Sequence, residues 1–583
     1  MAEEDLIFGK NRHFFGGIEP SHMSVFKASQ YIDDNNNPCM RIKATLPSDT
    51  VFSNQTLCTV AGAVIRRRTD RYPENEFDGD FIADISNNCV IMDNNVEYNK
   101  TYYYSAFPYS KQGVYNRSSK NRTSFQIEEY YYFGFDMDTT NSDPDANVTY
   151  PSDVQNASYD PAYMDFDHSV FNYGSWPSEG GKYFMPRPVV LRCDVNGNVD
   201  IPDDGYLDEN DYASGEPGRY IDGSLDDETY FYNVMMQWPK IYMHREITED
   251  GVYKFRCSDR KLGDDWDCYC NYNLNGEEID HFYTPVYNGC DKSILNTDTI
   301  AVRSISGVIP NNALTGVYAE INSMILGVQN NNQGEQKGWN IETMTDRFLI
   351  QDLLVLMAKS TNTQVSYGNG YYASSASSMT LENGTLNDKG LFYGYDNYKH
   401  GVKVFGMENW WGYMGRATSG LLIDHNEDGD GKPYMYLSNS LNYSIEDVEY
   451  PTHTLIRLKD LYPKTTSRYD YLFTSTYMSS YTGGYGCVKP FGRIPYIKGG
   501  SKSTYEADYI HICTPGTNTN SAVFLSCGTG SIYYNSGTSV NNDSEPYAGA
   551  FAMCFMAKAS DGLWNMPKIY ACPSFRPYQG AAG

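Results

Sequence analysis

The chain has 583 residues and a formal net charge of −28, from 73 acidic and 45 basic residues. This length predicts two or more domains, each able to bury a hydrophobic core. The negative charge argues against a nucleic-acid-binding protein, which needs a basic face to displace the counterions of the phosphates. It argues equally against electrostatic attachment to an anionic membrane.

Tyrosine is unusually abundant, with 53 residues. Its side chain provides a large contact area at a low cost in rotamer entropy and ends in a polar group, so adhesive surfaces favour it. A β-rich protein that uses tyrosine in its strands would explain the same count. Composition alone leaves both explanations open.

The 13 cysteines are scattered along the chain. We expect reduced thiols, as in a protein assembled in bacterial cytoplasm. The first residues, MAEEDLIFGKN, have neither the basic nor the apolar region of a secretory signal. No apolar run approaches the roughly 20 residues of a membrane-spanning helix, so no membrane insertion is expected.

Short strand-like runs separated by turn clusters predict a small β-sandwich over residues 20–127. The runs are Met23–Ser29, Met40–Leu46, Thr59–Arg67, Phe81–Ile85 and Tyr102–Tyr109. The last run resembles the penultimate strand of fibronectin type III domains, in which alternate aromatics enter the core and a tyrosine ties down a corner. The resemblance implies a fibronectin-like spacer domain.

A helix is predicted from Asn312 to Leu326, where apolar residues recur at helical spacing and Gly327 stands at the position of a C-terminal cap. A hairpin is predicted before it. Its strands, 240–247 and 252–258, flank the turn sequence Thr-Glu-Asp-Gly.

A second helix is marked by Thr343 and Asp346, which have the spacing of a capping box. Apolar residues follow on more than one face of the helix: Phe348, Leu349, Leu353, Leu356 and Met357. This distribution predicts a helix buried between sheets.

Four stretches carry a resemblance that covers most of the chain. They are 130–151 (an aromatic strand followed by an Asp/Asn/Pro-rich connection), 235–241 (MMQWPKI), 302–307 (VRSISG) and 405–412 (FGMENWWG). In this order they resemble the large C-terminal module of tail-fibre proteins of bacteriophages that infect gut bacteria. The resemblance implies an attachment segment at residues 1–19, a β-rich connecting region at 128–235 and a receptor-binding module at 236–583.

The fold of this module is also implied by resemblance. A hairpin, two helices, a strand bearing Trp410 and Trp411, and then glycine-rich strands resemble the C-type lectin fold of formylglycine-generating enzymes and phage tropism determinants. The small-residue stretches 499–501 and 548–551 match that branch. We therefore expect a mainly β protein, a β-sandwich followed by an α+β, C-type-lectin-like module.

In tropism determinants the last strands and loops display the receptor-binding residues, which implies the segment from Tyr509 to Tyr547 here. Its tyrosines and amides suit a binding surface that combines rigid aromatics with adaptable hydrogen bonds, although a plain polar loop has the same composition. The candidate receptor-binding residues are Asp508, Tyr509, His511, Tyr533, Tyr534, Asn535, Asn541 and Asn542.

One candidate metal site matches the first half of an EF-hand loop, in which alternate oxygen side chains wrap calcium. Its ligands would be Asp424, Asn426, Asp428 and Asp430. Met435 stands where the loop needs a bidentate glutamate, and the flanks look like strands, so a solvated acidic turn is the alternative. No other cofactor is expected.

The chain has no G-x-S-x-G, H-E-x-x-H or phosphate-loop motif, which favours a binding protein over an enzyme. The resemblance implies a virion tail-fibre protein, made in the host cytoplasm, that binds a glycan or protein receptor on the host cell. It also implies contacts with other tail proteins and a homotrimer, whose several copies add avidity. Two alternatives stay open: a structural baseplate or decoration protein of the virion, and a polysaccharide depolymerase.

Overall fold

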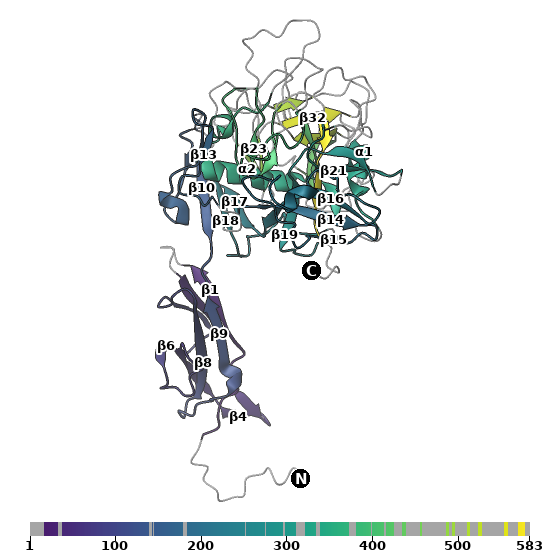
Figure 1. Cartoon of the computed structure of the whole chain (residues 1–583). Coiled ribbons are helices and arrows are strands. Elements are labelled where there is room, and N and C mark those ends of the chain that lie inside the picture. The colour runs from purple at the N-terminus through teal and green to yellow at the C-terminus, as the bar shows by residue number, and fades with distance from the viewer. Residues whose placement is uncertain are drawn as a thin grey trace, which may run out of the picture. The chain divides into compact units, whose positions relative to one another are not determined.

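The computed structural model divides the chain into two compact units, unit 1 (Met1–Tyr130) and unit 2 (Tyr131–Gly583) (Figure 1). The structure describes residues 17–32, 38–138, 141, 143, 145–178, 183–250, 252–273, 276–294, 298–310, 321–333, 338–371, 381–397, 399–412, 415–424, the strands between 434 and 557 named below, and 569–577. Within these residues the protein is mainly β, as predicted, and no helix is long and apolar enough to cross a membrane.

Unit 1 contains two antiparallel sheets that share one core, one with the strand order β1-β2-β7 and the other with the order β6-β5-β8-β9. The strands of the first sheet are β1 (Val25–Ile32), β2 (Pro38–Thr45) and β7 (Cys89–Asp93). Those of the second are β6 (Asp80–Ile85), β5 (Val60–Arg68), β8 (Lys100–Ser110) and β9 (Arg122–Ile127). A separate hairpin joins β3 (Thr50–Phe52) and β4 (Gln55–Cys58). Each of the five predicted strand runs overlaps one of these strands.

A buried polar cluster connects the two sheets of unit 1. The Arg67 guanidinium on β5 donates to both carboxylate oxygens of Asp93 on β7, at 2.9 and 2.8 Å. Tyr104 on β8 donates its hydroxyl to the same carboxylate at 2.7 Å. Near the start of β8, Tyr102 is buried and its hydroxyl oxygen accepts the Glu97 backbone N–H at 2.9 Å. The predicted inward-facing tyrosines therefore also fix the connection that precedes the strand.

Unit 2 contains three larger sheets. The four-stranded sheet has the order β11 (Val148–Thr149), β10 (Tyr132–Asp138), β18 (Val252–Ser258), β17 (Tyr242–Ile247). The six-stranded sheet has the order β15 (Val199–Asp200), β14 (Arg187–Asp194), β16 (Tyr230–Pro239), β19 (His281–Pro285), β34 (Pro573–Phe575), β22 (Trp339–Ile341). The predicted hairpin is the antiparallel pair β17 and β18. Strand β16 spans residues 235 and 236, so the residues on both sides of the predicted domain boundary share one sheet.

The seven-stranded sheet is built from strands of the last third of the chain. Its order is β27 (Leu455–Arg457), β26 (Tyr434–Ser438), β25 (Gly415–Asp424), β31 (Val523–Cys527), β32 (Met553–Ala557), β30 (Ile510–Ile512), and β33 (Ile569–Ala571) pairs in parallel with β25. The short pairs are β12 (Tyr163–Asp165) with β13 (Val170–Asn172), β20 (Cys290–Ser293) with β21 (Ile300–Arg303), β23 (Lys403–Val404) with β24 (Met407–Glu408), and β28 (Tyr485–Val488) with β29 (Gly492–Pro495).

The first predicted helix ends later than expected. Helix α1 (Ile321–Gln329) continues through Gly327, so the predicted C-terminal cap at this glycine is wrong. The last carbonyls are instead satisfied by asparagines: the Asn330 N–H donates to Leu326 O at 2.9 Å, and Asn331 Nδ2 donates to Val328 O at 2.8 Å. The predicted start of this helix, residues 312–320, lies outside the described residues.

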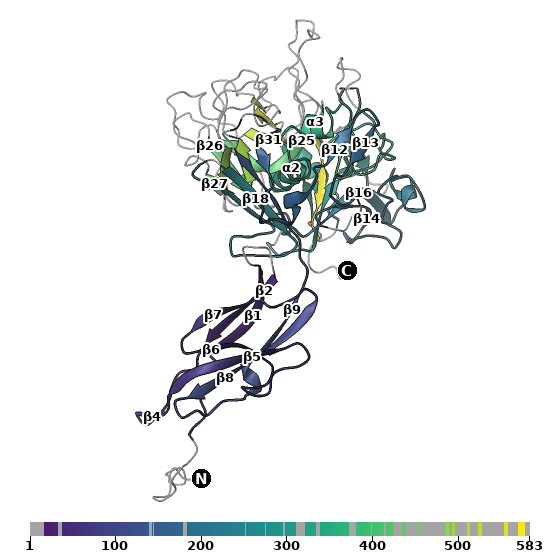
Figure 2. The same cartoon turned by 90° about the vertical axis from the view of Figure 1, so that its left-hand side faces the viewer.

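Helix α2 (Met344–Ala358) begins with the predicted capping box and is buried along its whole length, as predicted. Figure 2 shows it near the middle of unit 2. Its charged residues have partners on other elements. Asp352 accepts from Arg245 Nε on β17 at 2.8 Å, Asp346 accepts from Arg576 just after β34, and the Arg347 guanidinium lies 3.9 Å from the centre of the Trp410 ring.

The tryptophan pair does not form the predicted strand. Trp410 and Trp411 lie in a bend after β24, because Asn409 has a φ of 49° and takes the backbone out of the extended conformation. Both indoles are fully buried. Trp411 donates its N–H to Gly368 O at 2.9 Å, and Trp410 donates to Glu342 Oε1 at 3.4 Å. The pair therefore belongs to the core of unit 2 and exposes neither ring face to solvent.

Substituting Asp346→Ala should destabilise unit 2 by roughly 3–5 kcal/mol, because the change leaves the Arg576 guanidinium buried without its ion pair. All seven tryptophans of the chain lie in unit 2, so tryptophan fluorescence during denaturant unfolding reports on this unit. The matched control is Glu216→Ala, which breaks the exposed Arg219–Glu216 pair and should cost less than about 1 kcal/mol. Equal effects of the two substitutions would contradict this account.

Candidate functional site

Most of the predicted receptor-binding residues lie outside the described residues. These are Asp508, Tyr509, Tyr533, Tyr534, Asn535, Asn541 and Asn542. The backbone of His511 lies in β30, which pairs in parallel with β32, and the Cα partner of His511 is Cys554. The small-residue stretches 499–501 and 548–551 also lie outside the described residues, so the display surface predicted from them stays a prediction.

The candidate calcium loop is described only at its start. Asp424 is the last residue of β25, while Asn426, Asp428 and Asp430 lie outside the described residues. The register pairs Asp424 with Tyr434, so both flanks of the loop are strands, as the sequence indicated. Among the residues that the structure describes, no three His, Cys, Asp or Glu side chains are grouped so that they could hold a metal ion.

A different aromatic surface is fully described on unit 2. The Tyr395 surface consists of Tyr393, Tyr395 and His400, with the Ser169 hydroxyl beside them. The Tyr395 and His400 rings stack with their centroids 4.2 Å apart, and the Tyr393 ring meets Tyr395 edge-on at 5.6 Å. His400 is exposed and the two tyrosines are half-buried. Ser169 Oγ and Tyr395 Oη share a hydrogen bond of 2.7 Å.

The loop that carries Tyr395 is fixed by helix α3 (Thr363–Tyr367) and the residues after it. Asn369 donates its backbone N–H to Tyr395 O at 2.8 Å and its side-chain amide to Asp396 O at 2.7 Å. Gly394 packs so closely that an added Cβ would lie 1.9 Å from Tyr367 O, so only glycine fits there. The backbone is therefore fixed on both sides of Tyr395.

The β12–β13 hairpin supports the same surface from the other side. Figure 2 shows this hairpin beside α3. Phe171 on β13 stacks on Phe392 at 4.4 Å and on Tyr367 at 5.7 Å, which anchors the hairpin to the core. Ser169 has a φ of 56°, an uncommon conformation for a residue other than glycine. This conformation places its hydroxyl on Tyr395.

The Tyr395 surface combines ring faces with hydrogen-bonding groups at their edges. Aromatic faces complement the apolar face of a pyranose, while tyrosine hydroxyls and an imidazole can bond sugar hydroxyls. Sequence reasoning missed this surface. Two tyrosines on either side of Gly394 could have indicated an aromatic turn. The hydrogen bond between Ser169 and Tyr395 joins residues 226 positions apart, and no local sequence pattern predicts it.

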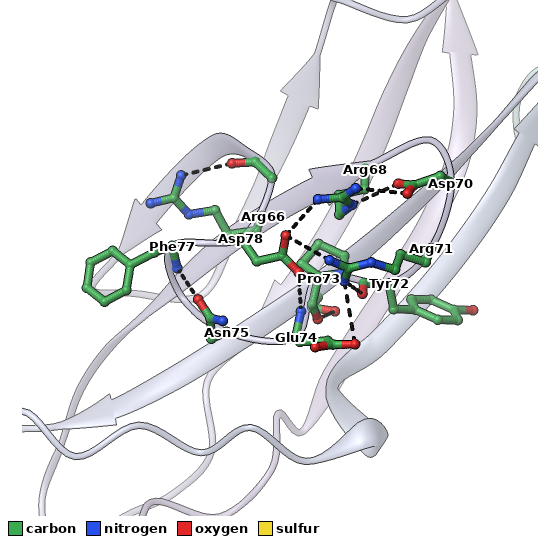
Figure 3. A network of polar contacts seen from close by, with 12 residues as sticks. Arg66, Arg68, Asp70, Arg71, Tyr72, Pro73, Glu74, Asn75, Phe77 and Asp78 are labelled. Atoms are coloured by element: carbon green, nitrogen blue, oxygen red, sulfur yellow. Dashed lines mark hydrogen bonds and ion pairs between the residues drawn. The ribbon is translucent and has the colours of Figure 1, made fainter.

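Unit 1 also presents an exposed aromatic residue, on the connection between β5 and β6 (Figure 3). We call residues 69–79 the Phe77 loop. The Phe77 side chain is 80% exposed, more than any other large hydrophobic side chain among the described residues. On one side of it, Glu76 is buried and accepts two hydrogen bonds from Arg117, at 2.9 and 2.6 Å. On the other side, Asp78 accepts from Arg68 at 2.8 Å and from Arg71 at 2.6 Å.

Hydrogen bonds and neighbouring arginines keep the carboxylates of Glu76 and Asp78 charged. The Glu74 backbone N–H, followed by the Arg71 and Arg68 guanidinium groups, lowers the pKa of Asp78 to about 2. The Arg117 guanidinium likewise lowers the pKa of Glu76. The loop therefore keeps its ion pairs over the whole neutral and mildly acidic range, and Phe77 stays exposed on a fixed backbone.

Comparison with known proteins adds no relatives. No protein-family model matches the chain, and no curated protein is significantly similar to it.

The ion pairs of Asp78 should stabilise unit 1 in a pH-dependent way. The folded-state pKa of about 2 lies below the ordinary value of 3.8, so the stabilisation is complete above about pH 4 and is lost as the pH falls toward 2. Scanning calorimetry of Asp78→Asn against the unchanged chain should show a difference in the unit 1 melting temperature that is largest at pH 7 and smaller at pH 3. Phe77→Ser is the control and should melt like the unchanged chain. A difference that does not vary with pH would contradict the assignment.

Proposed function

We propose that this chain is a tail-fibre protein of a bacteriophage virion that binds a receptor, a glycan or a protein, on the host cell surface. The sequence resemblance supplies the biological setting. The structural observation that supports it is the Tyr395 surface, in which two half-buried tyrosines and the exposed His400 lie on a loop that Asn369, Gly394 and Ser169 hold in place. A pre-positioned surface of this kind loses little conformational entropy on binding.

A fibronectin type III-like spacer is proposed for unit 1. Three strands packed on four, in the orders given above, fit that family of antiparallel sandwiches. The buried Tyr102, which hydrogen-bonds to the backbone five positions upstream, resembles the tyrosine corner of these domains. The domain would hold the binding unit away from the site of attachment.

A C-type-lectin-like module is proposed for residues 236–583. The hairpin β17–β18, helices α1 and α2, and strands toward the end of the chain come in the order that the resemblance implies, whereas the strand expected at Trp410 and Trp411 is a bend. The late strand β34 returns to pair with β19 and β22, on either side of it in the six-stranded sheet. In this module the predicted segment around His511 and the Tyr395 surface are two candidate contact regions for the receptor.

Adsorption of the purified, fluorescently labelled full chain to a panel of gut bacteria tests the proposal. The chain should bind at least one strain, and Tyr393→Ala with His400→Ala should weaken binding at least tenfold without changing the unfolding midpoint. Val195→Ser, which removes an exposed apolar side chain elsewhere in unit 2, is the control and should bind normally. Failure of the unchanged chain to bind any strain would contradict the proposal.

The predicted segment needs its own variant, Tyr533→Ala with Tyr534→Ala, measured in the same assay. Point substitutions are preferred to deletion of the late segment. Truncation after Asp460 would also remove β34 and Arg576, which are buried in the core of unit 2. Reduced adsorption of this variant would assign receptor contact to the late segment. Unchanged adsorption would exclude these two tyrosines from the contact.

A further inference from the structure

We infer that Phe77 and Phe81 form a contact between copies of this chain, so that the protein associates through unit 1. The inference does not depend on the receptor or on the sugar-binding chemistry of unit 2. It rests on three features of unit 1: a fixed exposed aromatic residue, a second exposed ring beside an arginine on an edge strand, and an almost balanced charge.

The Phe77 loop exposes its aromatic ring on a fixed backbone. Both neighbours of Phe77 are fixed, Glu76 by Arg117 and Asp78 by Arg68 and Arg71. The Phe77 N–H itself donates to Asn75 Oδ1 at 3.0 Å. An exposed ring on a backbone that is already fixed costs little backbone entropy on association, which is a property of an interface anchor.

Phe81 extends this apolar feature along strand β6. Its ring is 58% exposed, and the Arg66 guanidinium lies 5.1 Å from the ring centre. Arg66 also donates to Glu76 O at 2.6 Å and to Gly79 O at 3.3 Å, so it connects the Phe77 loop with Phe81. Aromatic residues and arginine are enriched at the energetic centres of protein interfaces. Phenylalanine has no hydroxyl for a sugar, which favours a protein partner.

Strand β6 lies at the edge of its sheet, where one side of its backbone has no neighbouring strand in the order β6-β5-β8-β9. Isolated proteins avoid exposed edge strands and contiguous exposed apolar surface. Phe81 belongs to this edge, and its Cα partner in the sheet is Arg66 on β5. A second chain can therefore approach β6 from the side without displacing any described strand.

Charge favours unit 1 over unit 2 as the place where copies of the chain meet. Acidic and basic residues nearly balance in unit 1, whereas unit 2 carries almost all of the net charge of −28. Two copies that met through unit 2 would repel each other, because both surfaces are strongly negative. Electrostatic repulsion between copies is weaker at the nearly neutral unit 1. Near Phe77 the charges are paired locally: Arg71 pairs with Asp78 within the loop, and Arg68 at the end of β5 pairs with Asp70. A closed, symmetric oligomer is the usual result of such self-association.

Sedimentation velocity of the full chain from nanomolar to micromolar concentration tests this inference. The unchanged chain should form a closed oligomer, and Phe77→Ser with Phe81→Ser should weaken association at least tenfold and shift the mass toward the 66.0 kDa monomer. The control variant, Val51→Ser with Phe52→Ser, removes two exposed apolar side chains from the β3–β4 hairpin and should associate normally. Calorimetry should show that both variants melt like the unchanged chain.

Three outcomes would overturn the inference: a monomeric unchanged chain at micromolar concentration, an oligomer unaffected by the Phe77 and Phe81 substitutions, or equal dissociation of the control. The adsorption assay separates this result from the receptor proposal. A monomeric variant should still bind host cells, but more weakly, because it loses the avidity of several copies. Loss of self-association and loss of receptor binding are thus measured independently.

Discussion

Complete burial of helix α2 is the constraint on which unit 2 depends. A buried charge is tolerated only with a partner, and this helix removes Asp346, Arg347 and Asp352 from water. Their partners come from a strand of the early hairpin, from a bend after β24 and from the last described residues of the chain. The helix can therefore reach its final environment only after distant segments have assembled around it, so the unit should fold as one cooperative body with many non-local contacts.

The same principle organises unit 1 on a smaller scale. The Arg67–Asp93 pair and the Tyr104 hydroxyl lie between the two sheets, so any other alignment of the sheets would leave a charge unpaired in the core. Paired charge is also used at the surface, where arginines fix the two residues that flank Phe77. In unit 1, arginine–carboxylate pairs thus both align the two sheets and fix the residues on either side of the exposed Phe77.

Local features were predictable from the sequence and distant pairings were not. The capping box at Thr343, the β17–β18 hairpin and the strands of unit 1 depend on neighbouring residues, and the structure has them. The partner of Asp346 is 230 residues away, and nothing in the local sequence specifies it. The helix end at Gly327 was misplaced because the asparagines after it cap the last turn, and the strand at Trp410 was misplaced because Asn409 turns the backbone.

The candidate sites follow the same division. The receptor segment was assigned from the resemblance to tropism determinants and from its tyrosines and amides, and the calcium loop from its match to half of an EF-hand loop. Both assignments stay predictions. The Tyr395 surface needed the fold, because Ser169 and Tyr395 come together only when the β12–β13 hairpin packs against α3. Rigid aromatic residues on both units are consistent with a protein that works by binding.

The most direct test of this account is a binding isotherm of the purified full chain on intact gut bacteria, measured before and after periodate oxidation of the surface glycans. Saturable binding to at least one strain supports receptor recognition, and its loss after periodate would identify a glycan receptor. Saturable binding that survives periodate would point to a protein receptor, which the account also allows. Absence of saturable binding to every strain tested would contradict the central claim that unit 2 recognises a host cell surface.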